Sequence, residues 1–214
     1  LMLQNQTEEE FADSRFQVLS ELTRLRQLCC DPALVYENYE GGSAKLDLCI
    51  ELIQSAVESG HKILLFSQFT SMIEILTARL QEESISYFVL QGSTKKEQRA
   101  QMVEQFNRDD TSVFCISLKA GGTGLNLTGA DIVIHYDPWW NVAVENQATD
   151  RAHRIGQKNV VTVYKLIAKG TIEEKIIKLQ QRKKELAEEI LSGDEIKTAS
   201  FQREELLELL EERF

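Results

Sequence analysis

Residues 113–136, VFCISLKAGGTGLNLTGADIVIHY, place a short apolar run on each side of a glycine-rich segment. The first run covers residues 113–118, the second covers residues 132–136, and both are almost continuously apolar. Runs of this kind are typical of strands that are covered on both faces. Three more, also rich in branched and aromatic side chains, occur at residues 63–67, 86–90 and 160–167. We therefore expect five strands, each covered on both faces.

Helical periods lie between these predicted strands. Residues 71–83 and 95–108 each place apolar side chains on one helical face, and residues 142–151 also have helical character. Strands that alternate with helices through short connections predict an α/β fold, in which helices cover both faces of an open and mainly parallel sheet. The ligand site of such a sheet lies beyond the carboxyl ends of its strands. We therefore look for chemistry in the loops that follow residues 65, 90, 118 and 136.

The two flanks of this region differ from it. Residues 7–28 have the pattern of a polar helix that should end before Pro32. A Gly-Gly-Ser sequence at residues 41–43 indicates a hinge or turn before a helix at 45–59. After Gly170 a long helix is expected, with a break near residues 192–194 and an amphipathic piece at 204–212. We therefore divide the chain into a helical segment at 1–43, an α/β domain at 44–170 and C-terminal helices at 171–214.

Charge is distributed unevenly along the chain. The 214 residues include 34 acidic and 24 basic ones, for a formal net charge of −10. Residues 145–184 contain ten basic and four acidic residues, whereas residues 185–214 contain three basic and ten acidic ones. A phosphate backbone responds to the local potential, so the net acidity does not exclude a nucleic-acid partner.

Several kinds of protein are disfavoured by what the sequence lacks. No apolar run approaches the roughly 18 residues of a membrane span, so we expect a soluble cytosolic or nuclear protein without a membrane partner. The four cysteines have no paired spacing and the three histidines are scattered, which predicts reduced thiols and no metal site. The sequence has no Walker phosphate loop, nucleophile elbow or zinc-protease motif. Because the chain begins with Leu1, we expect it to be part of a longer protein.

Two segments carry residues suited to phosphate. The glycine-rich stretch at 120–126 favours either a loop whose N–H groups approach an anion or a tight turn. The sequence QATDRAHRIGQ occupies residues 147–157. If the helix at 142–151 extends through it, Gln147, Arg151 and Arg154 share one face and form a fork for phosphate at the carboxyl edge of the sheet. The alternative is a solvated basic helix end.

In this order the motifs resemble those of the second motor lobe of SWI/SNF-type ATP-dependent DNA translocases, within helicase superfamily two. Residues 117–127 resemble motif V, residues 137–141 (DPWWN) a characteristic block of the family, and residues 147–157 motif VI. Weaker matches occur at residues 65–69, at 91–94 with Arg99, at 25–32 and at 170–175. Val142 departs from the family, which usually has proline there.

The resemblance implies a RecA-like lobe at 44–170, an inter-lobe segment before it and bracing helices after it. ATP with Mg²⁺ would bind between this lobe and an N-terminal RecA-like lobe, which would supply the phosphate loop and the Mg²⁺ ligands. Arg151 and Arg154 would be arginine fingers, which neutralise charge that develops on the γ-phosphoryl group. Gln147, Gly124 and Asn126 would also approach ATP.

The resemblance also implies double-stranded DNA as a partner, held through its phosphates and not read for sequence. The residues assigned to DNA follow the strands; they are Ser67, Gln68, Gly92, Ser93, Thr94, Ser117, Lys119, Gly121 and Gly122. Trp139 and Trp140 would link the side of the lobe that faces DNA to the side that faces ATP, although paired tryptophans are also common packing residues. The basic run at 178–184 favours a solvated helix face over a DNA contact. A protein–DNA complex is a candidate target for remodelling.

Other functions remain open on the sequence alone. The chain could be a lobe-like module that binds a partner without catalysis, through residues 206–210 or the tryptophan loop. It could also belong to an RNA helicase, although the tryptophan block and motif VI favour the DNA translocase. A dinucleotide-dependent oxidoreductase is disfavoured because the fingerprint loop and its ribose-binding acid are missing. We expect the full-length protein to act in the cytoplasm if it is bacterial or archaeal and in the nucleus if it is eukaryotic.

Overall fold

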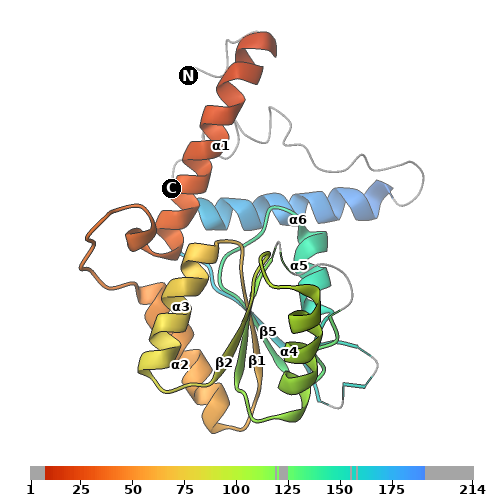
Figure 1. Ribbon diagram of the computed structural model, residues 1–214. Coiled ribbons are helices and arrows are strands. Elements are labelled where there is room, and N and C mark those ends of the chain that lie inside the picture. Colours follow the sequence, from red (N-terminus) through yellow and green to blue (C-terminus); the bar gives the residue numbers. More distant parts are fainter. Residues whose placement is uncertain (1–7, 119, 121–124, 155, 158, 191–214) are drawn as a thin grey trace.

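The computed structural model describes residues 8–190 except 119, 121–124, 155 and 158. From β1 onward helices and strands alternate along the described chain, except that β4 follows β3 without a described helix between them (Figure 1). In order they are α1 (Glu8–Cys30), the short 3₁₀ helix η1 (Pro32–Leu34), α2 (Ala44–Glu58), β1 (Ile63–Ser67), α3 (Thr70–Glu82), β2 (Tyr87–Leu90), α4 (Lys96–Arg108), β3 (Val113–Ser117), β4 (Ile132–His135), α5 (Val142–Thr149), β5 (Thr162–Lys165) and α6 (Ile172–Ile190). The amphipathic piece expected at 204–212 lies outside the described residues.

The five strands form one parallel sheet in the order β2-β3-β1-β4-β5. β1 is central, and Ile63 lies in register with Val113 of β3 and with Ile132 of β4. The prediction of an α/β fold with a parallel sheet is confirmed, and the arrangement is RecA-like. All carboxyl ends of the strands therefore meet at one edge of the sheet.

Alternating side chains of the strands enter two separate cores. Ile63 and Leu65 point to the face that α2 and α3 cover, where they pack with Ile53 and Leu76. The intervening residues, including Phe66, point to the opposite face and pack with residues of α4 and α5. Because a strand has a period of two, a continuously apolar strand must be covered on both faces. Helices do lie on both faces of the sheet, as predicted.

β5 departs from that pattern. All four of its residues are exposed, and Val163 and Tyr164 each retain 39% of their accessible surface. The expectation that every strand is covered on both faces is therefore wrong for β5. β5 is one of the two outer strands, and only its flanking residues Val161 and Leu166 reach the two cores, whereas β2, the other outer strand, is partly covered.

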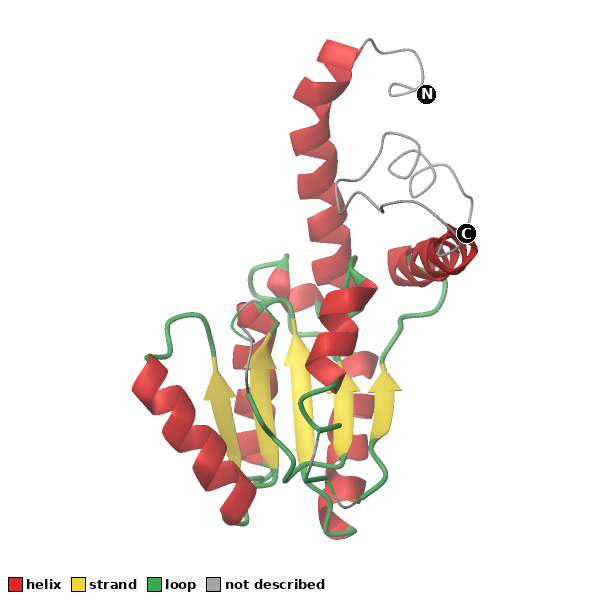
Figure 2. Ribbon diagram, turned by 90° about the vertical axis from the view of Figure 1, so that its right-hand side faces the viewer, coloured by secondary structure: helices red, strands yellow, loops and turns green. Residues whose placement is uncertain are grey.

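α1 and α6 lie beyond the carboxyl edge of the sheet. Figure 2 shows the strand arrowheads pointing toward the end of the molecule from which α1 rises and along which α6 runs. Leu22 of α1 packs there with Ile172, Ile176 and Leu179 of α6 in a third apolar cluster. The two flanking segments thus contact each other above the edge where ligands of such a sheet bind.

None of the described helices combines the length and apolarity that a membrane crossing demands. The four cysteines are unpaired, and Cys30, Cys49 and Cys115 are buried. Burial raises the pKa of the Cys49 thiol to about 12, which keeps this group protonated and unreactive.

Candidate functional site

The loops at the carboxyl edge are tied together around Asp137. This side chain, which follows β4, is buried. It accepts hydrogen bonds from Ser67 Oγ at 2.6 Å and from the Gln68 N–H at 3.3 and 3.4 Å. Burial raises the pKa of the Asp137 carboxyl to about 6, against the opposing effects of the Ser67 hydrogen bond and the charge of Arg26. Asp137 therefore holds the loop that follows β1.

The hydroxyl groups of Ser67 and Ser117 are not presented at this edge. Ser67 is fully buried, and its Oγ also accepts the Phe69 N–H at 3.2 Å. Ser117 retains only 2% of its accessible surface. These two hydroxyls are therefore not available at the surface, and the assignment of the two residues to DNA stays a prediction. Each serine ends a strand that is buried on both faces, so its side chain turns into the protein.

Arg99 of α4 clamps the loop that follows β2. Its Nε donates to the Thr94 carbonyl oxygen at 2.8 Å, and its Nη2 donates to the Gly92 carbonyl oxygen at 3.1 Å. Its Nη1 donates to the Ala120 carbonyl oxygen at 3.0 Å, beyond β3. Gly92 and Ser93 are exposed at the tip of this loop. The sequence indicated Arg99 only as part of a motif, because the carbonyl groups that it binds lie on two separate loops.

A second group of predicted residues lies over the face that α4 and α5 cover. The Leu127 N–H donates to the Arg151 carbonyl oxygen at 3.1 Å, which places Asn126 beside the arginine segment. Asn107 Nδ2 donates to the Asn126 carbonyl oxygen at 2.8 Å and fixes its backbone. The structure therefore brings Asn126 and Arg151 together. Lys119, Gly121, Gly122 and Gly124 lie outside the described residues.

Gln147, Arg151 and Arg154 do not share one helical face. α5 ends at Thr149, and turns follow it. Gln147 and Arg154 are exposed, whereas Arg151 is buried with its guanidinium 5.8 Å from the centre of the Phe66 ring. Burial, with a smaller contribution from the Arg154 charge, lowers the pKa of Arg151 to about 10, so Arg151 remains charged at neutral pH.

The end of this segment lies away from the carboxyl edge of the sheet. Gln157 Nε2 donates to the Ala130 carbonyl oxygen at 2.7 Å and to the Ala152 carbonyl oxygen at 3.2 Å. Ala130 precedes β4, so the segment turns out of the helix and runs across the face toward the amino end of that strand. These hydrogen bonds hold the end of the segment beside the residues that precede β4.

Trp139 and Trp140 enter different cores. Trp139 packs against the cluster on the face that α4 and α5 cover, and Trp140 packs against the cluster between α1 and α6. Gln180 of α6 donates a hydrogen bond to the Trp139 carbonyl oxygen. The tryptophan loop therefore connects the sheet to both flanking helices.

The conserved C-terminal domain of helicases matches residues 44–156, which are more than half of the chain. The chain belongs to this helicase family. A solved SWI2/SNF2 ATPase C-terminal domain from Sulfolobus solfataricus is 33% identical, with a TM-score of 0.70, and the match covers 91% of this chain and 81% of that one. This places the chain among SWI2/SNF2-type lobes of helicase superfamily two, as the motifs predicted.

Two further matches involve longer proteins. The Sulfolobus solfataricus SWI2/SNF2 ATPase core in complex with double-stranded DNA is 35% identical, with a TM-score of 0.72, over 93% of this chain and 42% of that one. A Mycoplasma pneumoniae protein named an uncharacterized ATP-dependent helicase is 45% identical over 202 residues, 92% of this chain and 19% of that protein. The chain thus spans about a fifth of the length of this curated relative.

Within this SWI2/SNF2 lobe, α6 is anchored by two buried carboxylates. Glu173 of α6 binds Lys45 of α2, with both carboxylate oxygens 2.6 Å from Nζ. Glu145 of α5 accepts a hydrogen bond from Gln180 of α6 at 3.0 Å and lies 3.2 Å from Lys165 Nζ. α6 is therefore held to both helical layers of the lobe.

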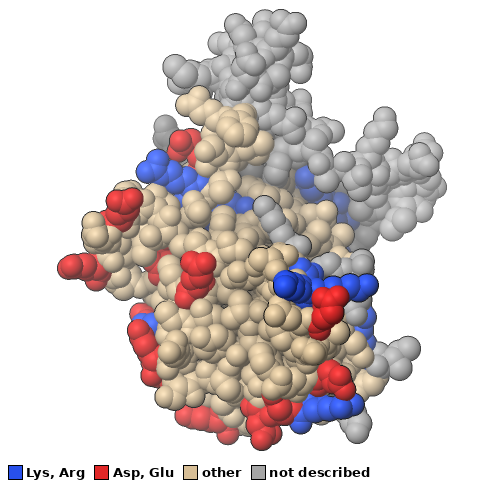
Figure 3. Space-filling view, viewed as in Figure 1, with Lys and Arg blue, Asp and Glu red and all other residues tan. Residues whose placement is uncertain are grey.

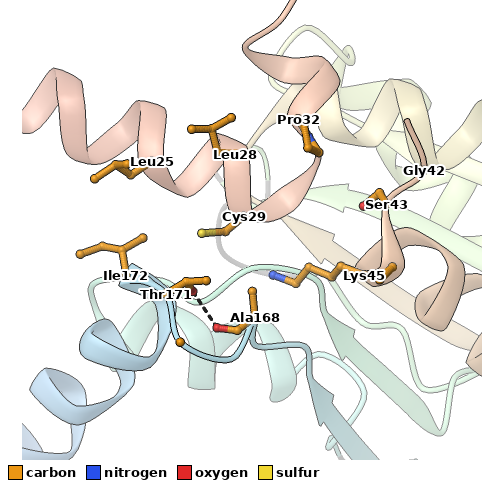
Figure 4. Close-up of a pocket in the computed structure, with 12 residues that line it drawn as sticks. Leu25, Leu28, Cys29, Pro32, Gly42, Ser43, Lys45, Ala168, Thr171 and Ile172 are labelled. Atoms are coloured by element: carbon orange, nitrogen blue, oxygen red, sulfur yellow. Dashed lines mark hydrogen bonds between the residues drawn. The ribbon is translucent and has the colours of Figure 1, made fainter. Parts of the chain in front are cut away.

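A cavity of about 530 Å³ opens beside the first of these anchors. Figure 4 shows Leu25, Leu28 and Cys29 of α1 facing Ile172 and Thr171 across it, with Lys45 on a third side. The Thr171 hydroxyl donates to the Ala168 carbonyl oxygen at 2.6 Å, and Lys45 is paired with Glu173. The polar groups of these two side chains are thus used within the lobe, and the cavity walls are mainly apolar.

Charged side chains lie mainly around the margin of the face seen in Figure 3, and its centre is largely uncharged. Acidic residues predominate along the lower and left margins of this view. On this face, the described residues form no broad basic surface for a phosphate backbone. The loops at the carboxyl edge, where Gly92, Ser93 and Lys95 are exposed, are the better candidate.

Proposed function

We propose that this lobe is the second half of a DNA-dependent ATPase that moves along double-stranded DNA. The observation that carries the proposal is that one SWI2/SNF2 lobe has two separate surfaces, each with residues suited to binding phosphate. The loops at the carboxyl edge are clamped by Asp137 and Arg99, while Asn126, Arg151 and Arg154 lie on or beside the face that α4 and α5 cover. One surface suits a phosphate backbone, and the other suits a nucleotide.

The second surface has the donor set that ATP requires. Guanidinium groups and a side-chain amide supply hydrogen-bond donors, and arginine is the side chain best matched to phosphate oxygens. Arg154 is exposed and can contact a phosphoryl group directly, whereas Arg151 is buried next to it and contributes its positive charge from below the surface. Mg²⁺, held by ligands of the N-terminal lobe, would neutralise part of the charge on the phosphates of ATP. Arg151 and Arg154 would stabilise the charge that develops on the γ-phosphoryl group, with Gln147 and Asn126 orienting the nucleotide.

The carboxyl edge would hold one DNA strand. Asp137 and Arg99 fix the backbones of the loops that contain Gln68, Gly92, Ser93 and Thr94. Hydrogen-bond donors in these loops would therefore lose little conformational entropy when they bind a phosphate. Among the described residues, Gln68 Nε2 has no hydrogen-bond partner, but it is buried and would have to turn outward to reach a phosphate. Ser67 and Ser117 would act indirectly, by holding the backbone of this edge. Closure of the two lobes on ATP would then step the edge along the DNA.

The test is ATP hydrolysis by this chain alone, by the N-terminal lobe alone and by the two mixed, each with and without duplex DNA. We expect hydrolysis that requires both pieces and that DNA stimulates. The lobe alone should be inactive, because it has no phosphate loop. ATP hydrolysis by this lobe alone would contradict the proposal that the N-terminal lobe supplies the phosphate loop. A mixture that associates but stays silent would favour a binding module without catalysis.

A further inference from the structure

The crevice between the ends of β1 and β4 is filled by an arginine from outside the sheet. β1 and β4 are neighbours, but β1 leads into α3 on one face and β4 leads into α5 on the other. Where neighbouring strands diverge in this way, an open α/β sheet forms its ligand-binding crevice. α1 delivers Arg26 into this position, and only 2% of its surface is exposed.

Arg26 contacts both loops that border the crevice. Its Nη2 donates to the Pro138 carbonyl oxygen at 2.6 Å and lies 3.9 Å from Asp137 Oδ2. Its guanidinium carbon lies 4.6 Å from the centre of the Trp140 ring and 5.7 Å from that of Phe69. Phe69 follows β1 and Trp140 follows β4, so one side chain of α1 lies between the two loops.

Burial of the Arg26 charge costs desolvation free energy, so this arrangement is not an effective way to stabilise a fold. Burial lowers the pKa of Arg26, which means that the charged form is penalised in this position. Among the described residues, Arg26 Nε has no hydrogen-bond partner. An apolar side chain of similar size would often serve stability as well or better. What an apolar side chain could not do is hold the Pro138 carbonyl and Asp137 at the same time.

We propose that Arg26 is a positioning residue, which couples the position of α1 to the two loops that would face DNA. This inference rests on the proposed function, because it concerns the same carboxyl edge. Asp137 carries the effect onward, since the same carboxylate accepts hydrogen bonds from Ser67 and Gln68. A shift of α1 therefore moves the loop after β4 directly and the loop after β1 through Asp137. Arg26 touches neither nucleotide nor DNA in this scheme.

The test uses the full-length protein that contains this lobe and compares Arg26→Met, Arg26→Lys and the control Arg24→Met. Arg24 is an exposed arginine on the same helix, so its variant controls for the loss of one charge. We measure the thermal midpoint and the kcat and KM for ATP with and without saturating duplex DNA. For Arg26→Met we expect DNA stimulation of kcat to fall at least about tenfold while the KM for ATP changes less than about twofold. Arg26→Lys should restore part of the stimulation, and Arg24→Met should match the wild type.

The outcomes separate coupling from simple stability. Unchanged DNA stimulation in Arg26→Met would overturn the inference. So would an equal fall of basal and stimulated hydrolysis with a lower thermal midpoint, since that pattern reflects loss of folded protein. If Arg26→Met does not fold, the pair Arg26→Met with Asp137→Asn removes the unpaired carboxylate and is compared with Asp137→Asn alone; equal DNA stimulation in these two proteins would overturn the inference. Wild-type protein that DNA does not stimulate would refute the proposed function itself, whatever the variants do.

Discussion

Loss of the Lys45 charge should weaken the attachment of α6 to the lobe. Lys45 lies in the first turn of α2 and Glu173 in the first turn of α6, 128 residues away. Both Glu173 oxygens are 2.6 Å from Lys45 Nζ, and Oε2 also accepts the Ala168 N–H at 2.8 Å. Glu173 is fully buried. The change Lys45→Met keeps most of the aliphatic stem but leaves this carboxylate without its counter-charge.

The size of the effect follows from this geometry. Two unit charges 2.6 Å apart attract by roughly 6 kcal/mol at an effective dielectric constant of about 20. The removal of both ions from water offsets most of that attraction, so the intact pair contributes little net stability. Lys45→Met alone leaves the desolvated carboxylate unpaired, and we expect a loss of about 3–5 kcal/mol. The total stability of a domain is about 5–15 kcal/mol, so the loss should be large.

Urea unfolding of this chain, followed by circular dichroism, measures the loss. Adding Glu173→Gln to Lys45→Met removes the buried charge and keeps an acceptor for the Ala168 N–H, so at least about 2 kcal/mol should be recovered. The control Lys96→Met, at an exposed position on α4, should stay within about 0.5 kcal/mol of the wild type. A loss below about 1 kcal/mol in Lys45→Met, or no recovery in the double variant, would refute the reasoning.

Three other outcomes are expected. In the full-length protein, Arg154→Ala should reduce DNA-stimulated hydrolysis by about 10³-fold or more and leave DNA affinity unchanged. Arg108→Ala is the control. Normal hydrolysis by Arg154→Ala would refute the assignment of Arg154 as an arginine finger. The pKa of Asp137 is raised to about 6 in the folded chain, so the folded state binds this proton more tightly than the unfolded state. The wild type should therefore gain about 2 kcal/mol of stability relative to Asp137→Asn between about pH 7.5 and about pH 4.5 in denaturant titrations, and a constant difference would contradict it. DNA binding by the full-length protein should be indifferent to sequence and weaken steeply with salt in fluorescence anisotropy titrations, whereas salt-insensitive binding to one sequence would oppose a phosphate-backbone site.

Much of the lobe can be predicted from local patterns in the sequence. The apolar runs at 63–67 and 113–117 become strands that are buried along their whole length. A short, continuously apolar run has few alternatives, because both of its faces must be covered. The order of the motifs likewise indicates the family, since each motif is a contiguous stretch of residues. These inferences depend on neighbours in the chain and therefore need no knowledge of the tertiary structure.

The tertiary structure alone decides which groups are available at the site. Ser67 is a polar residue at the predicted edge, but Asp137, 70 residues away, binds its hydroxyl inside the protein. The segment after α5 is held by Gln157, whose amide reaches back to the Ala130 carbonyl oxygen. Arg26 meets Pro138 across 112 residues of sequence. Helix propensity and motif spacing carry no information about such partners, because a hydrogen bond between distant segments exists only after the sheet has brought them together.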